Sequence, residues 1–150
     1  MNAFEQSLNH LLVDTFNYIL KYEETSLKKN LRVPVTITEA HMIEAVGNQV
    51  NQETTVSGIA SLLGIAMPTA TVAVKKLEHK GFIKKIPCAN DGRSTIISLT
   101  ELGKKIERAH RLFHERLVRN ISRQFADVEK EVLLHAVKTL SDFFKEKVEA

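Results

Sequence analysis

One helical face in the middle of the chain gathers side chains that can bind the bases and phosphates of DNA. At 100° per residue, the segment between Gly64 and Gly81 turns its small apolar side chains to one side. The opposite side holds Pro68, Thr71, Val72, Lys75 and His79, with Thr69 and Lys76 on its flank. Hydroxyls and amines bond base edges and phosphates, and a valine methyl group can contact a thymine methyl group. The pattern predicts a helix that enters a major groove.

Basic charge is concentrated in and after this segment. Between Met67 and Thr95, six basic residues stand against two acidic ones, a net charge of +4, whereas the whole chain carries +3. Such a local excess is the electrostatic signature of a DNA-binding surface. One alternative is a small helical domain with a solvated lysine face. Another, from a different functional class, is a pure oligomerising scaffold, and the concentrated charge argues against that one.

Neighbouring elements must position this face. A first helix is predicted over 56–63, and Gly64 ends it because glycine tolerates a left-handed conformation. Pro68 suits the first turn of the next helix, and Gly81 ends that helix. Two strands are predicted after it, over 82–88 and 94–99, with a turn at 90–92 between them.

The hairpin and its surroundings resemble a known family. Asp91 to Arg93, followed by Ser-Thr-Ile-Ile-Ser-Leu-Thr-Glu-Leu-Gly over 94–103, resembles the wing of the MarR family of bacterial transcription regulators. Residues 77–83, Leu-Glu-His-Lys-Gly-Phe-Ile, resemble the family's junction between recognition helix and wing. The resemblance implies that Arg93 enters the minor groove, that Asp91 braces its guanidinium group and that Ser94 belongs to the DNA-contacting set.

One residue departs from the family pattern. Ala66 stands where the family often has a Ser or Thr that caps the recognition helix. Its methyl group cannot accept a hydrogen bond, which costs about 1 kcal/mol of capping energy. A phosphate contact from this position is therefore not expected.

The resemblance implies a mainly α fold with a small β-hairpin wing, a winged helix-turn-helix with terminal dimerisation helices. We expect one MarR-type domain over 1–150, with the DNA-binding module at about 36–100 and dimerisation helices at 1–30 and 101–150. Apolar periodicity predicts long helices over 1–29, 100–121 and 127–147. A shorter helix over 39–47 is predicted to be capped by Thr38, and 48–55 to form a polar connector.

The long terminal helices carry more apolar surface than one small winged domain needs. This surplus predicts a homodimer, and the family resemblance implies the same assembly. Two recognition helices related by a two-fold axis meet successive major grooves at a spacing of about 34–36 Å, so a pseudo-palindromic operator is expected. Tilting the terminal helices changes that spacing, which gives an effector a way to control DNA binding.

Three segments resemble one branch of the family. They are 23–27, 37–47 and 109–114, and together they look like the fatty-acid-synthesis repressors of Gram-positive bacteria. This resemblance implies acyl-acyl carrier protein as corepressor, with its acyl chain in an apolar tunnel. The candidate tunnel residues are Leu12, Phe16, Met42, Val46 and Phe113. The alternative is that these five are ordinary core residues.

Four polar residues form a candidate metal site. His110 and His114 are four residues apart on one predicted helix, a spacing that suits two ligands of one zinc ion. With Glu23 and His41 they match, by position, a site in the zinc-responsive MarR repressors, although Ala40 and Lys29 depart from that pattern. Three interpretations remain open: a hydrogen-bonded network between dimer helices and DNA module, the border of an acyl pocket, or a zinc site.

Composition limits the other functional classes. No run of about 18 apolar residues suggests a membrane span, and the N-terminus lacks a signal-peptide layout. A single cysteine, Cys88, excludes an intrachain disulfide, which suits a reducing cytoplasm. No nucleophile motif, phosphate-binding glycine loop or HExxH motif is present, so no enzyme is expected. The expected partners are duplex DNA and a second copy of the chain.

Overall fold

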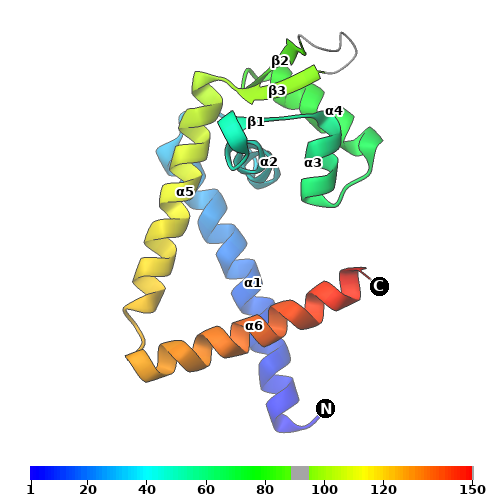
Figure 1. Ribbon diagram of the computed structural model, residues 1–150. Coiled ribbons are helices and arrows are strands. Elements are labelled where there is room, and N and C mark those ends of the chain that lie inside the picture. Colours follow the sequence, from blue (N-terminus) through cyan, green and yellow to red (C-terminus); the bar gives the residue numbers. More distant parts are fainter. Residues whose placement is uncertain (89–94, 150) are drawn as a thin grey trace. The chain divides into compact units, whose positions relative to one another are not determined.

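A computed structural model describes residues 1–88 and 95–149 of the chain (Figure 1). It divides into two compact units, Met1–Phe113 and His114–Ala150. The elements are α1 (Ala3–Asn30), α2 (Ile37–Gly47), the 3-10 turn η1 (Val50–Gln52), β1 (Glu53–Thr54), α3 (Val56–Leu63), α4 (Met67–His79), β2 (Ile83–Pro87), β3 (Thr95–Leu99), α5 (Glu101–Ser122) and α6 (Asp127–Glu149). The predicted fold class, mainly helical with a small wing sheet, is confirmed.

The core of the first unit lies where α2, α3 and α4 meet the sheet. Side chains from all of these elements are buried together: Ile43, Val46, Ile59, Ala70, Val74, Leu77, Ile83, Ile97 and Leu99. The predicted packing side of α4 is confirmed, since its residues in this list are almost fully buried. Burial of an aliphatic side chain is worth about 1.5–3 kcal/mol, so this cluster fixes α4 against the sheet.

The sheet has one strand more than the predicted hairpin. Its order is β1-β3-β2, all antiparallel, with Ile83 opposite Leu99 and Thr54 opposite Ile97. In Figure 1, β3 lies between its two partners. The prediction of a polar connector over 48–55 was wrong at its end, because a two-residue strand is too short to show an alternating pattern.

The start of α2 also differs from the prediction. Thr36, and not Thr38, is the N-cap residue of α2. The Thr36 hydroxyl accepts from the Glu39 backbone N–H at 3.2 Å, and the Glu39 carboxylate accepts from the Thr36 N–H at 3.0 Å. This reciprocal pair is a capping box, whose Thr-x-x-Glu spacing only Thr36 satisfies.

The helix-turn-helix follows the predicted boundaries closely. Helix α3 begins after Thr55, whose hydroxyl accepts from the Gly58 N–H at 3.0 Å, and ends at Gly64 with φ of +61°. Helix α4 begins after Ala66, which makes no side-chain capping bond, as predicted. Among the described residues no single helix is long and apolar enough to cross a membrane; only α3 and α4 taken together, at a bend of 114°, have the length and composition for it.

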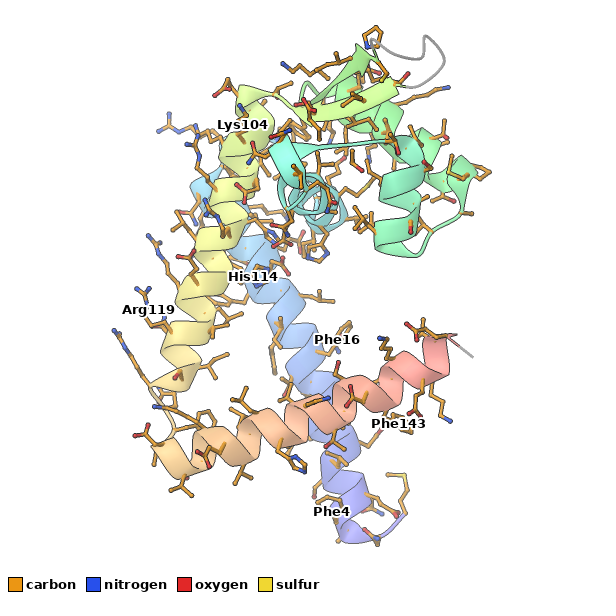
Figure 2. All side chains as sticks on the ribbon, viewed as in Figure 1. Phe4, Phe16, Lys104, His114, Arg119 and Phe143 are labelled. Carbon is orange, nitrogen blue, oxygen red and sulfur yellow. The ribbon has the colours of Figure 1, made fainter. Side chains whose placement is uncertain are left out.

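The terminal helices expose apolar side chains. No described residue of α6 is buried, and Phe143 and Phe144, whose rings lie edge to face, are each 52% exposed. In the first unit, Phe4 and Phe16 are also exposed on α1 (Figure 2). Large apolar side chains that lack cover within one chain mark surfaces that bind another molecule.

Candidate functional site

The outer face of α4 is the first candidate site. Val72 is 68% exposed, while Ala70 and Val74 on either side of it are buried in the core. The Thr71 hydroxyl donates to the Met67 carbonyl at 2.9 Å and keeps its lone pairs for another donor. Pro68, Thr69 and Lys75 are exposed on the same helix. The structure therefore presents the predicted major-groove face to solvent.

The lysines near this face differ in their pairing. Lys76 lies 3.3 Å from a Glu39 oxygen, Lys80 lies 2.8 Å from the other oxygen, and Lys85 lies 2.7 Å from Glu78. Among residues 1–88 and 95–149, no ion pair involves Lys75 or Lys84. Lys75 is thus the recognition-helix lysine whose charge is most available for a phosphate.

Three predicted DNA-contacting residues, Asp91, Arg93 and Ser94, lie outside the described residues. The strands on either side of them are described, and Pro87 pairs with Thr95 at the distal end of the hairpin. Cys88, just beyond β2, is half-buried. The β2–β3 pairing therefore supports a wing at the expected place in the chain.

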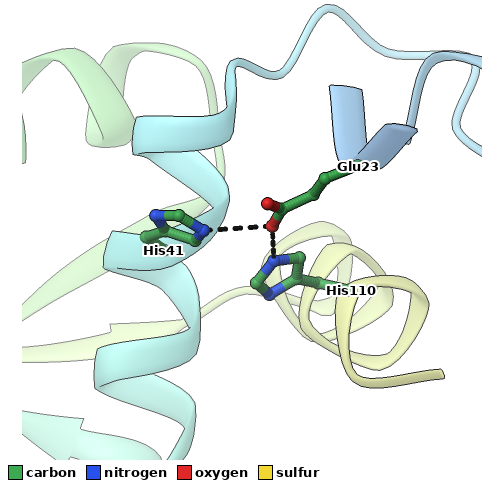
Figure 3. Close-up of side chains that lie close together, drawn as sticks. All are labelled: Glu23, His41 and His110. Atoms are coloured by element: carbon green, nitrogen blue, oxygen red, sulfur yellow. Dashed lines mark hydrogen bonds and ion pairs between the residues drawn. The ribbon is translucent and has the colours of Figure 1, made fainter. Parts of the chain in front are cut away.

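The second candidate site is a cluster of Glu23, His41 and His110 (Figure 3). Glu23 comes from α1, His41 from α2 and His110 from α5. The His41 Nε2 lies 3.0 Å from the Glu23 Oε1, and the His110 Nε2 bonds the same oxygen. A carboxylate only accepts, so both rings donate from Nε2. Three helices are thus joined at one buried oxygen.

Burial and pairing act in opposite directions on this carboxyl group. Burial alone raises the pKa of Glu23, but the hydrogen bonds from His110 and His41 outweigh it and hold the pKa below its usual value. His110 is fully buried, whereas the His41 side chain is 43% exposed. Glu23 therefore carries its negative charge at neutral pH.

The chemistry of the donors fits a metal ion. The ligand atoms of Glu23, His41 and His110 all lie within 4.8 Å of one another. Two imidazole nitrogens and a carboxylate oxygen are common zinc ligands. His114, the fourth predicted ligand, lies one turn further along α5 and belongs to the second unit.

Sequence reasoning missed two glutamates near these sites. Glu39 is buried between Lys76 and Lys80, and Glu44 lies 3.4 Å from the His110 Nδ1. The capping-box spacing from Thr36 to Glu39 was the signal that could have identified the first. No local pattern marks Glu44, because its partner is far away in the sequence.

The five predicted tunnel residues lie in different environments. Met42 and Val46 are buried in the core, and Phe113 is buried with its ring 5.2 Å from that of Tyr22. Leu12 is half-buried, and Phe16 is 64% exposed. The five residues are thus divided among α1, α2 and α5, and only those of α2 and α5 are buried.

Comparison with known proteins agrees with this architecture. Residues 35–95 match the model of the MarR family. The chain is 28% identical over 116 residues to the transcriptional regulator ZitR of Lactococcus lactis subsp. cremoris, covering 75% of this chain and 78% of that protein. The structure of Streptococcus pneumoniae FabT in complex with DNA is similar with a TM-score of 0.87 and 28% identity, covering 95% and 98% of the two chains.

A solved structure of Lactococcus lactis ZitR, a zinc-responsive MarR family member, is also similar. Its TM-score is 0.66 at 25% identity, with 91% of this chain and 99% of that chain covered. These matches agree with the helix-turn-helix, the exposed α4 face and the paired wing strands. Residues 35–95 of the chain match the MarR family, and nearly the full chain shares the winged-helix fold of the DNA-bound regulator FabT.

Proposed function

We propose that the chain acts as a homodimeric repressor on a pseudo-palindromic operator. The observation that supports this most is the division of α4 into a buried side and an exposed side that carries Val72 and Lys75. The exposed apolar side chains of α6 support self-association, because a lone chain leaves them in water. A two-fold pair of α4 helices would read two half-sites about one helical turn apart.

The test is a gel shift with genomic fragments, followed by selection of bound duplexes from a random pool. A two-fold symmetric consensus is expected, together with a dimer by light scattering at micromolar concentration. Affinity should fall by roughly 10³–10⁵ between 50 and 200 mM salt if six to ten phosphates are contacted. A monomer, or a consensus without symmetry, would remove the proposal.

For the regulated genes, we propose the fatty-acid-synthesis branch, with acyl-acyl carrier protein as corepressor. The resemblance of 23–27, 37–47 and 109–114 supports this, as does the high structural similarity to FabT over nearly the full chain. Phe16 is exposed, whereas Phe113 and Met42 are buried, so we place the entrance of the proposed tunnel at Phe16. Long-chain acyl-acyl carrier protein should strengthen the gel shift, and the unacylated carrier should not.

The Glu23–His41–His110 cluster favours zinc as an alternative effector. The two Nε2 atoms would exchange their protons for the ion, so zinc binding should release protons. Dialysis against zinc and elemental analysis provide the test. Retention of zinc that is lost in His110→Ala and His114→Ala would support a zinc-responsive repressor. Less than about 0.1 zinc per chain, with DNA affinity indifferent to zinc and chelator, would exclude it.

A further inference from the structure

The end of the recognition helix is joined directly to the first turn of α5. The Thr100 hydroxyl donates to the Gly81 carbonyl at 2.6 Å and accepts from the Gly103 N–H at 3.1 Å. The Thr100 N–H donates to the Phe82 carbonyl at 3.1 Å. One side chain thus caps α5 and at the same time holds the turn at Gly81 and Phe82 that follows α4.

The α4 side of this junction is itself a tight turn. Gly81 has φ of +74°, and its N–H donates to the Glu78 carbonyl at 2.9 Å. The Phe82 N–H donates back to the Leu77 carbonyl at 2.9 Å. This pair of bonds is a Schellman motif, which fixes the direction in which the chain leaves the helix. The Gly81 carbonyl is therefore held rigidly to α4.

The α5 side is held by close backbone contact. A Cβ atom added to Gly103 would lie 2.0 Å from the Phe82 carbonyl oxygen, and a Cβ added to Gly47 would lie 2.7 Å from the Glu107 side chain. Backbone atoms cannot yield as a flexible side chain can. Only glycine at 103 allows α5 to begin at this distance from the end of α4.

We propose that Thr100 and Gly103 are positioning residues that set the angle between α4 and α5 and thereby the operator spacing that the dimer prefers. This inference rests on the proposed two-fold dimer, in which α5 leads into the dimerising helices. A rigid junction converts the fixed distance between subunits into a fixed distance between recognition helices. A loosened junction lets each recognition helix swing, so that operators of several spacings bind about equally well.

The test uses the duplex that the wild-type protein selects and versions with two base pairs inserted or deleted at its centre. Each such change displaces one half-site by roughly 7 Å along the axis and rotates it by roughly 70°. For the wild-type protein, the insertion or deletion should lower the affinity on the order of tenfold or more, which is comparable with the cost of one mismatched base pair. Thr100→Val keeps the side-chain shape and loses the hydroxyl bonds to the Gly81 and Phe82 carbonyls and from the Gly103 N–H. In this variant, the ratio of affinities for the original and the altered duplex should fall to about threefold or less.

Two controls separate positioning from general stability. Thr100→Ser keeps the hydroxyl and should restore the wild-type spacing ratio. Thr25→Val removes a hydroxyl whose one hydrogen bond within residues 1–88 and 95–149 is to the Lys21 carbonyl on α1, and this variant should also keep that ratio. Gly103→Ala, checked for folding by circular dichroism, should change the preferred spacing or flatten it.

The possible results are distinguishable. A Thr100→Val protein that binds every duplex more weakly by the same factor, with the spacing ratio intact, would overturn the inference and leave the proposed function standing. Should Thr100→Val not fold, an unchanged spacing preference in folded Gly103→Ala would overturn it equally. A wild-type protein without any spacing preference would instead overturn the proposed dimeric function, and the inference with it.

Discussion

Lys80, at the end of α4, donates to the Glu39 carboxylate at 2.8 Å, although 41 residues separate them in the sequence. The same lysine donates to the Pro34 carbonyl at 3.0 Å. Glu39 also completes the capping box of α2. The recognition helix is thus tied at its C-terminal end to the first turn of α2.

Replacing Glu39 by Gln should destabilise the protein by roughly 1–3 kcal/mol, the usual worth of hydrogen bonds to a charged group. Glutamine still completes the capping box, so the loss reports the pairing with Lys80 and Lys76. Urea unfolding at neutral pH measures it. Equal stability of the two proteins would show that desolvation of Glu39 cancels the pairing.

The difference in stability between the wild type and Glu39→Gln should depend on pH. Burial raises the pKa of Glu39, but hydrogen bonds from Lys80, the Thr36 backbone and Lys76 outweigh it and lower the pKa below the usual value. A carboxyl with a lowered folded-state pKa stabilises the protein above its unfolded-state pKa. The advantage of wild type over Glu39→Gln should therefore vanish as the pH falls below the ordinary carboxyl range and through the lowered pKa.

His110→Ala should cost more stability than His41→Ala, although both remove one bond to the same Glu23 oxygen. The His110 side chain is fully buried, so its loss opens a cavity beside a buried carboxylate and costs roughly 2–3 kcal/mol. His41 is partly solvated, and water replaces it at about 1 kcal/mol or less. The stabilities of the two variants are compared by urea unfolding with a chelator present, so that bound metal does not contribute. Equal losses of stability in His110→Ala and His41→Ala would contradict the difference in burial between the two side chains.

The periodicity of the sequence identified which face of each helix is apolar, but it did not identify every residue with which these helices and strands pair. The bounds of α3 were predicted because Gly64 and the apolar stripe are local signals. The β1 strand was missed because two residues show no period, and its partner β3 lies more than 40 positions away. The Glu39–Lys80 pair was missed for the same reason. The Glu23–His41–His110 cluster was anticipated only through family resemblance. Spacing along the sequence places His110 and His114 on one face of the same helix, but it cannot show which residues of other helices lie beside them.

Val72→Ala should change sequence preference and leave stability within about 0.5 kcal/mol, because the side chain is mostly exposed. A shorter side chain loses contact with a thymine methyl group, so discrimination at one position of each half-site should relax. Selection from a random duplex pool shows this directly. Val50→Ala, exposed in the segment before β1, is the matched control and should reproduce the wild-type consensus. An unaltered consensus for Val72→Ala would take this residue out of the base-contacting set.

Lys75→Ala should weaken binding to all DNA sequences about equally. A phosphate contact carries no sequence information, and each one contributes about 0.9 to the slope of log affinity against log salt. A homodimer loses two such contacts, so the slope should become shallower by about 2. Lys138→Ala, on α6 and paired with Asp142, should keep the wild-type slope. A Lys75→Ala slope equal to that of the wild type would rule out phosphate contact.

Phe143→Glu should produce monomers without unfolding the chain. Phe143 is half-exposed, and no described residue of α6 is buried, so a charge there meets water in a single chain and apolar surface in a dimer. Light scattering at micromolar concentration should report a dimer for the wild type and for Val50→Glu, a control at a position that is 84% exposed outside the terminal helices. The Phe143→Glu monomer should lose most of its affinity for the full operator but keep the weak binding of the wild type to an isolated half-site, since each recognition helix is untouched. A Phe143→Glu protein that remains dimeric would place the dimer interface elsewhere than on this part of α6.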